Sequence, residues 1–126
     1  MKEKWAVVTD FDSTITTFDI GDHIAIVFKT ASKKQVEDSY APGVAVEKWM
    51  TGIFGRLEAK PVDLKRHVLK TADIRKNAVR FFEYCVEKRI PVEIASGGLD
   101  VYAYPLLSKY KINVRTYFGR AAFKGA

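Results

Sequence analysis

The fold is decided by the stretch AVVTDFDSTIT, residues 6–16, in which apolar residues run into two aspartates and then two hydroxyl residues. Trp5 to Val8 form a short apolar run rich in β-branched residues, which is typical of a buried parallel strand. Asp10 and Asp12 then stand at its carboxyl end, where open α/β sheets bind their ligands. The stretch therefore predicts an α/β fold with a polar site at the end of its first strand.

Two carboxylates at this spacing suit metal or phosphoryl chemistry. Like charges so close are costly unless a cation lies between them, and Mg²⁺ is usually held by one or two carboxylates with substrate phosphate and water. A carboxylate can also attack phosphorus and form an aspartyl-phosphate. A bare D-x-D more often only ends a strand or starts a turn. The apolar strand before Asp10 and the Ser13-Thr14 pair after Asp12 favour the site.

The run Asp10-Phe11-Asp12-Ser13-Thr14 resembles the first motif, D-x-D-x-T, of the haloacid dehalogenase (HAD) superfamily phosphatases. The resemblance implies that Asp10 is the nucleophile and that Asp12 is the general acid and base. It also implies that the Asp10 carboxylate and the Asp12 main-chain carbonyl hold Mg²⁺, and that Thr14 helps to bind phosphate.

Ser96-Gly97-Gly98 is the second chemical signal, placed between a predicted strand at 90–95 and a predicted helix at 99–110. Amides at a helix N-terminus carry partial positive charge and bind phosphate, and the serine hydroxyl adds a donor. Alone, the tripeptide is more often a tight turn. Together with the first motif it resembles the second HAD motif, which implies that Ser96 and Gly97 bind phosphate.

The residues between the two motifs read first as an all-helical insert and then as α/β structure. Apolar spacing predicts helical segments from His23, over 35–40, over 44–57 and from Pro61, then a helix at 74–88 and a strand at 112–118. An insert in this place resembles the C1-type helical cap of the family. We therefore expect a HAD-like Rossmannoid parallel sheet, truncated, from residues 1–16 and 71–126, with a helical cap at 17–70.

Substrate choice in such enzymes is made by the cap. Asp19, with Asp22 beside it, and Arg56 are the candidate substrate contacts, although a solvent-facing arginine is at least as common as a substrate ligand. Trp49 is expected in the core rather than as an aromatic wall for the substrate.

Three further residues receive structural interpretations. His23 and His67 have no partner at a ligand spacing, so both are expected to be structural or at the surface. Cys85 is the single cysteine and lies in an apolar helical pattern, which indicates a core residue.

The residues around the second motif make the resemblance to the family more specific. Ala95 to Asp100, followed by Tyr104-Pro105-Leu106-Leu107, resembles enolphosphatase-type members of methionine salvage, within the phosphoserine phosphatase-like branch. This implies an Mg²⁺-dependent phosphomonoester hydrolase that acts through an aspartyl-phosphate on a small phosphorylated metabolite.

The sequence departs from the family after Ser96. The third motif is a basic residue and the fourth is a pair of acids, yet Asp100 is the only later acidic residue, and neither Lys109 nor Lys124 has the expected context. Two aspartates alone make a poor Mg²⁺ cage.

The same departure is expected to leave the first strand as an open sheet edge. The chain's own tail, a homodimer partner or the missing C-terminal half of a natural or cloned fragment would cover it. The alternative function is a catalytically incomplete HAD-like module that binds phosphate or a protein partner.

Composition sets broad limits. The chain of 126 residues is 48% hydrophobic and 29% charged, the balance of a soluble domain. It has no apolar run of about 18 residues and no signal-peptide pattern, so a cytoplasmic, membrane-free location is expected. Residues 1–63 carry 8 basic and 10 acidic groups, whereas 64–126 carry 13 and 5. The basic half either steers a phosphate ester or is a solvated face, and no basic-aromatic motif favours nucleic acid.

Overall fold

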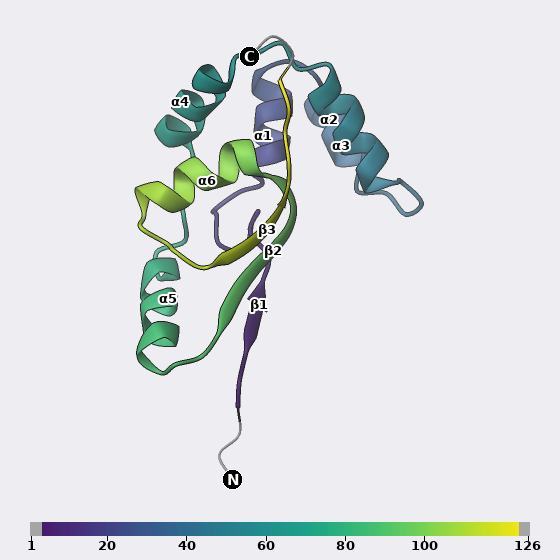
Figure 1. Ribbon diagram of the computed structural model, residues 1–126. Coiled ribbons are helices and arrows are strands. Elements are labelled where there is room, and N and C mark those ends of the chain that lie inside the picture. Colours follow the sequence, from purple (N-terminus) through teal and green to yellow (C-terminus); the bar gives the residue numbers. More distant parts are fainter. Residues whose placement is uncertain (1–3, 124–126) are drawn as a thin grey trace.

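The computed structural model describes residues 4–123, so Lys124 lies outside the described residues. Figure 1 shows a small parallel sheet with helices beside it and beyond its carboxyl end. The elements in chain order are β1 (Val7–Thr9), α1 (Ile20–Val27), α2 (Lys33–Asp38), α3 (Val46–Gly55), α4 (Pro61–Thr71), α5 (Ala78–Glu87), β2 (Val92–Leu99), α6 (Asp100–Lys109) and β3 (Arg115–Gly119).

The sheet has the strand order β1-β2-β3, and both pairs of neighbours are parallel. Val7 lies opposite Val92, and Ile94 lies opposite Thr116. Each parallel connection carries helices, as a parallel crossover requires. The expected α/β fold with a parallel sheet is therefore confirmed.

The first strand is an open sheet edge, as expected, but the prediction that its side chains are buried is wrong. Within residues 4–123, β1 pairs with β2 alone, so its other edge is open. Val8 is 69% exposed and Trp5 is 68% exposed. Because side chains alternate along a strand, Val8 lies on the face opposite to Val7 and Thr9, and that face leaves it in contact with solvent.

One apolar core joins the sheet to the helices beside it. Ile94 of β2, Phe11 after β1 and Leu106 of α6 are fully buried in it. Leu64 of α4 and Ile20 of α1 belong to the same cluster. The sequence boundaries proposed for a separate cap at 17–70 stay a prediction, since helices from that segment share this core.

A smaller cluster forms where α1, α2 and α3 meet. It contains Ala25, Val36 and Ile53, with Trp49 packed against it. Figure 1 places these three helices beyond the carboxyl ends of the strands. The cluster holds α3 above the sheet edge that carries the two motifs.

Two local side-chain contacts move helix boundaries from their predicted places. The carboxylate of Asp19 accepts a hydrogen bond from the Asp22 amide at 2.9 Å, so α1 starts at Ile20 rather than at His23. The helix predicted over 35–40 starts at Lys33, because Ser32 caps α2 through a capping box with Gln35.

Other predicted boundaries can be checked in the same way. Pro61 opens α4, as expected. The helix predicted from residue 74 starts at Ala78, because Ile74 forms an antiparallel bridge with Thr16. The backbone amide of Arg75 donates to the carbonyl of Ile15 at 2.7 Å. The two ends of the helical insert are therefore tied together.

The two histidines, which have no ligand spacing in the sequence and are expected to be structural or at the surface, contact each other. His23 lies on α1 and His67 on α4, and their rings stack with centroids 5.1 Å apart. The two residues are 44 positions apart in the chain, so no local sequence pattern indicates their contact. Cys85 is buried on α5, which confirms its placement in the core.

Among the helices of residues 4–123, none combines the length and the apolar character that crossing a bilayer requires.

Candidate active site

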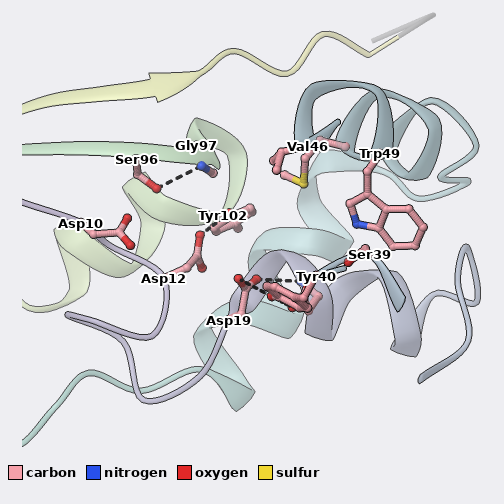
Figure 2. A pocket seen from close by; sticks show the side chains of 13 residues that line it. Asp10, Asp12, Asp19, Ser39, Tyr40, Val46, Trp49, Ser96, Gly97 and Tyr102 are labelled. Carbon is pink, nitrogen blue, oxygen red and sulfur yellow. Dashed lines mark hydrogen bonds between the residues drawn. The ribbon is translucent and has the colours of Figure 1, made fainter. Parts of the chain in front are cut away.

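A cavity of about 200 Å³ lies where β1 and β2 end, between the strand ends and α3 (Figure 2). Its walls are Asp10, Asp12, Asp19, Asp22, Ser39, Tyr40, Val46, Trp49, Met50, Ser96, Gly97, Gly98 and Tyr102. Both sequence motifs therefore meet in one cavity, because the carboxyl ends of adjacent parallel strands lie at the same edge of the sheet.

Asp10 follows β1 directly and its carboxylate opens onto the cavity. Its Oδ1 atom accepts a hydrogen bond from the Phe11 amide at 2.7 Å. Phe11 is fully buried, and its carbonyl accepts the amides of Thr14, Ile15 and Thr16. The motif thus turns sharply on a buried aromatic anchor, which leaves Asp10 at the surface of the cavity.

Two side chains outside the motif's central residues hold this turn. The Thr16 hydroxyl, in a fully buried residue, accepts from the Ser13 amide at 2.9 Å and donates to the Phe18 carbonyl at 2.6 Å. The Arg75 guanidinium donates to the carbonyls of Ser13 and Thr14 at 2.6 and 2.9 Å. Ser13 has a φ of 63°, an uncommon conformation for a side-chain-bearing residue. These bonds compensate for it.

Asp12 is held at both carboxylate oxygens. Oδ1 accepts from the Ile20 amide at 2.9 Å, and Oδ2 accepts from the Tyr102 hydroxyl at 2.6 Å. Burial, assisted by the charge of Asp19, raises the pKa of Asp12 to about 6, although its two hydrogen bonds oppose the rise. A carboxyl group with such a pKa can carry a proton near neutral pH, as a general acid must.

The Ser-Gly-Gly motif lies in the strand rather than in a separate loop, which corrects the predicted boundary. β2 continues to Leu99, with a change of register between Ala95 and Leu99. The hydroxyl of Ser96 accepts from the Gly98 amide at 3.0 Å. The backbone therefore curls beside Asp10 at the end of β2, and Gly97 is exposed in the cavity wall.

The wall opposite the motifs comes from the helices at the end of the sheet. The Tyr40 hydroxyl donates to Asp22 and, at 3.4 Å, to Asp19. Burial, assisted by the charge of Asp19, raises the pKa of Asp22, while the Tyr40 bond opposes the rise. Val46 and Trp49 of α3 face the cavity in Figure 2. Trp49, expected in the core, therefore lines the site while one side packs on the small cluster.

The charge of the cavity is one-sided. Its charged lining residues are the four aspartates Asp10, Asp12, Asp19 and Asp22, and within residues 4–123 no lysine, arginine or histidine lines it. The positive charge of residues 64–126 is therefore not part of this wall. An anionic ligand would meet net negative charge here unless a cation accompanies it.

The structure brings together most of the residues that the sequence singled out. Asp10, Asp12, Asp19, Ser96 and Gly97 share the cavity.

Two of the singled-out residues lie outside it. Thr14 is exposed, and Arg56 is exposed with its guanidinium donating to the Thr30 carbonyl at 3.2 Å. Their roles as ligands stay predictions.

Sequence reasoning did not find Tyr40, Tyr102, Thr16 or Arg75. Tyr102 lies four residues after Gly98, in the first turn of α6, which is the only local signal for it. The other three look like ordinary helix or turn residues in the sequence.

Comparison with known proteins gives relatives in sequence, although no family model matches the chain. The bifunctional enzyme MtnB/MtnX of Bacillus licheniformis is 30% identical over 122 residues, which are 93% of this chain and 28% of that protein. A 2-hydroxy-3-keto-5-methylthiopentenyl-1-phosphate phosphatase of Geobacillus thermodenitrificans is 31% identical over 112 residues, which are 85% of this chain and 50% of that protein. The chain thus spans half, or less, of these curated relatives.

Solved structures match over nearly the whole chain. A phosphoserine phosphatase determined as a phospho-aspartyl intermediate analogue has a TM-score of 0.77 at 19% identity, covering 98% of this chain and 60% of that one. A HAD family hydrolase of Salmonella enterica serovar Typhi has a TM-score of 0.78 at 17% identity, covering 95% and 42%. These matches establish the fold.

Sequence relatives, shared fold and the meeting of both motifs in one cavity agree: the chain is a member of the haloacid dehalogenase superfamily that matches part of the length of its phosphatase relatives.

Proposed function

We propose that the chain carries the reaction centre of an Mg²⁺-dependent phosphomonoester hydrolase. The observation that carries the proposal is the convergence of Asp10, Asp12, Ser96 and Gly97 in one cavity. The Asp10 carboxylate, the Asp12 carboxyl group with its raised pKa and the Ser96 hydroxyl all line this cavity, which supports the proposal.

The chemistry follows from these groups in two displacements. A carboxylate oxygen of Asp10 attacks phosphorus, the bond from phosphorus to the alcohol oxygen breaks, and Asp12 gives its proton to that oxygen. Water then attacks the aspartyl-phosphate, Asp12 takes the proton of that water, and inorganic phosphate leaves with Asp10 restored. Ser96 and the Gly97 amide donate hydrogen bonds to phosphate oxygens as charge shifts between them.

The oxygen atoms that line the cavity suit Mg²⁺ by their chemistry. The Asp10 carboxylate and the Asp12 main-chain carbonyl are hard oxygen ligands, and the surplus of four aspartates in the cavity favours a cation. Both oxygens of the Asp12 side chain already accept hydrogen bonds, so its carbonyl is the better donor. Bound there, Mg²⁺ would neutralise charge between the phosphate and the nucleophile.

A small phosphorylated metabolite is the proposed substrate class. The cavity of about 200 Å³ suits a small molecule, and Val46, Trp49 and Met50 offer it an apolar wall. Sequence relatives are named for 2-hydroxy-3-keto-5-methylthiopentenyl-1-phosphate, which we place first in a substrate panel. Contacts from Asp19, Arg56 and Thr14, and a cytoplasmic location, remain parts of this proposal.

The test is hydrolysis of 4-nitrophenyl phosphate with Mg²⁺ and with EDTA, using the wild type, Asp10→Asn and Glu83→Gln. Glu83 is exposed on α5 and controls for the loss of one carboxylate. Turnover that requires both the metal and Asp10, and survives Glu83→Gln, supports the hydrolase. Equal turnover by the wild type and Asp10→Asn would exclude Asp10 as the nucleophile.

A second candidate is a HAD-like module that binds phosphate, or a protein partner, without turnover. Two observations favour it: residues 4–123 contain no cluster of three metal-binding side chains, and the sheet edge at β1 is open. Calorimetric binding of inorganic phosphate in the presence of Mg²⁺, without hydrolysis of any ester, would support this function. Sedimentation would then reveal whether the module associates.

A further inference from the structure

We infer that Tyr102 is a positioning residue for the proposed hydrolase: its buried hydroxyl orients the Asp12 carboxyl group toward the leaving-group oxygen. The inference rests on the proposed function. It concerns a residue of α6, outside both motifs.

The contact itself is close and enclosed. Tyr102 is fully buried, and its hydroxyl donates to Asp12 Oδ2 at 2.6 Å, across 90 residues of chain. The Ile20 amide, at the start of α1, donates to Oδ1 at 2.9 Å. Residues of two helices, α1 and α6, therefore hold the Asp12 side chain. The orientation of its carboxyl group is set by these tertiary contacts rather than by its own loop.

The backbone beside Tyr102 and Asp12 leaves room for their contact. A Cβ atom added to Gly98 would lie 2.6 Å from Asp12 Oδ2 and 3.0 Å from the Cζ atom of Tyr102. Real Cβ atoms do not approach so closely, so only glycine at position 98 leaves room for the tyrosine–aspartate contact. Gly98 of the Ser-Gly-Gly motif, Asp12 of the first motif and Tyr102 therefore pack against one another.

The burial of the Tyr102 hydroxyl group requires a physical explanation. For packing alone a phenylalanine would fill the same volume, and burying an unbonded hydroxyl is costly. The hydrogen bond to Asp12 offsets that cost. Each carboxylate oxygen has a second lone-pair position, so Asp12 keeps the capacity to carry and transfer a proton while both donors hold it.

Orientation matters most when the proton is needed. A general acid works only if its proton lies within hydrogen-bond reach of the oxygen that leaves. An alkoxide is a poor leaving group and depends on that proton, whereas 4-nitrophenolate leaves with little help. Loss of positioning should therefore slow the two kinds of ester unequally.

The experiment compares Tyr102→Phe with Tyr104→Phe on an alkyl phosphate and on 4-nitrophenyl phosphate. Tyr104 is two residues further along α6, is exposed and lies outside the cavity lining, so it controls for loss of a hydroxyl from this helix. For Tyr102→Phe we expect kcat/KM to fall about tenfold or more on the alkyl ester and by less than about threefold on the aryl ester, because kcat/KM reports the steps up to release of the alcohol and leaves out the water step that both esters share. Tyr104→Phe should match the wild type.

Equal losses of kcat/KM on the two esters would overturn the inference, since a merely structural role slows both substrates alike. If Tyr102→Phe does not fold, 3-fluorotyrosine at position 102 keeps the hydroxyl and changes its donor strength. A changed ratio of alkyl to aryl turnover then supports the inference, and an unchanged ratio contradicts it.

If the wild type hydrolyses neither ester, the proposed function fails for this chain, and carboxyl ¹³C NMR decides the contact. The Asp12 signal is assigned by its loss in Asp12→Asn. A displacement of this signal in Tyr102→Phe, absent in Tyr104→Phe, supports Tyr102 as the group that orients Asp12. An unmoved signal shows that Tyr102 does not orient it.

Discussion

The Nε2 atoms of His23 and His67 lie 2.9 Å apart, which joins α1 to α4 through a stacked pair of imidazoles. Phe18 lies against His23 and Phe28 lies edge-on to His67. At this distance one ring donates a proton to the other, so the pair can hold together when at least one ring is neutral.

Acidification should weaken this contact between α1 and α4. Burial and the nearby His67 lower the pKa of His23 below its ordinary value of 6.5. The unfolded chain then binds more protons than the folded one near and below pH 6.5, so the stability from this group is present above that pH and lost below it.

The measurement for the histidine pair is urea unfolding of the wild type and His23→Gln between pH 7.5 and pH 5. We expect the stability difference between the two proteins to shrink as pH falls. A difference independent of pH would show that the pKa of His23 does not change on unfolding.

Asp12 should carry a stability cost above pH 6. Its pKa is raised by burial from 3.8 to about 6, so between these values the folded state holds a proton that the unfolded state releases. Raising the pH through that window favours unfolding, and the full cost is present above it. In metal-free buffer Asp12→Asn should therefore stabilise the protein at pH 7.5, by up to about 3 kcal/mol.

Chemical denaturation at pH 7.5 and pH 4, with Glu83→Gln as the surface control, checks this expectation. The gain from Asp12→Asn should be much smaller at pH 4, where the folded wild type carries the proton. A gain of equal size at both pH values would contradict the cause assigned here.

Thr16→Val should loosen the first motif. The Thr16 hydroxyl is buried, accepts from the Ser13 amide and donates to the Phe18 carbonyl. Valine keeps the shape but leaves these backbone groups unpaired, so the free energy of unfolding should fall by about 1–2 kcal/mol.

Thr71→Val is the matched control, because Thr71 is exposed at the end of α4 and bonds only within its helix. Its effect should stay within about 0.5 kcal/mol. Similar losses for both variants in urea unfolding would mean that the Thr16 network adds nothing particular.

Gly98→Ala should disrupt the site. The added Cβ would meet Asp12 Oδ2 at 2.6 Å, so the acid or Tyr102 must move. A displacement of this kind costs up to about 100-fold in kcat/KM when it misplaces a reacting group. Gly55→Ala, with open space at its Cβ position on α3, should leave turnover unchanged. Wild-type turnover by Gly98→Ala would contradict the close packing around Asp12.

The first-strand motif, the Ser-Gly-Gly segment and most helices could be predicted, since their signals are local. Asp10 follows an apolar run, Ser96 follows another, and Pro61 begins a helix. Apolar spacing reports which face of an element is buried, and adjacent parallel strands must end at one edge. Those rules alone place the two motifs at one edge of the sheet.

The predicted helix boundaries were wrong where a side chain outside the apolar pattern determines where the helix begins. Asp19 and Ser32 cap helices that apolar spacing alone begins elsewhere, and Ile74 is drawn into a bridge with Thr16. Trp49 has the spacing of a core residue, yet one side of it faces the cavity. Periodicity records that a residue is partly buried, but not what stands on its other side.

By itself the sequence determined the α/β class and the placing of Asp10 and Ser96 at the ends of parallel strands, because these depend on residues a few positions apart. Only the tertiary structure decided that Tyr102 grips Asp12 and that His23 meets His67. Such pairs join segments 90 and 44 residues apart. They depend on how helices cross over the sheet, and no local pattern of side chains encodes that crossing.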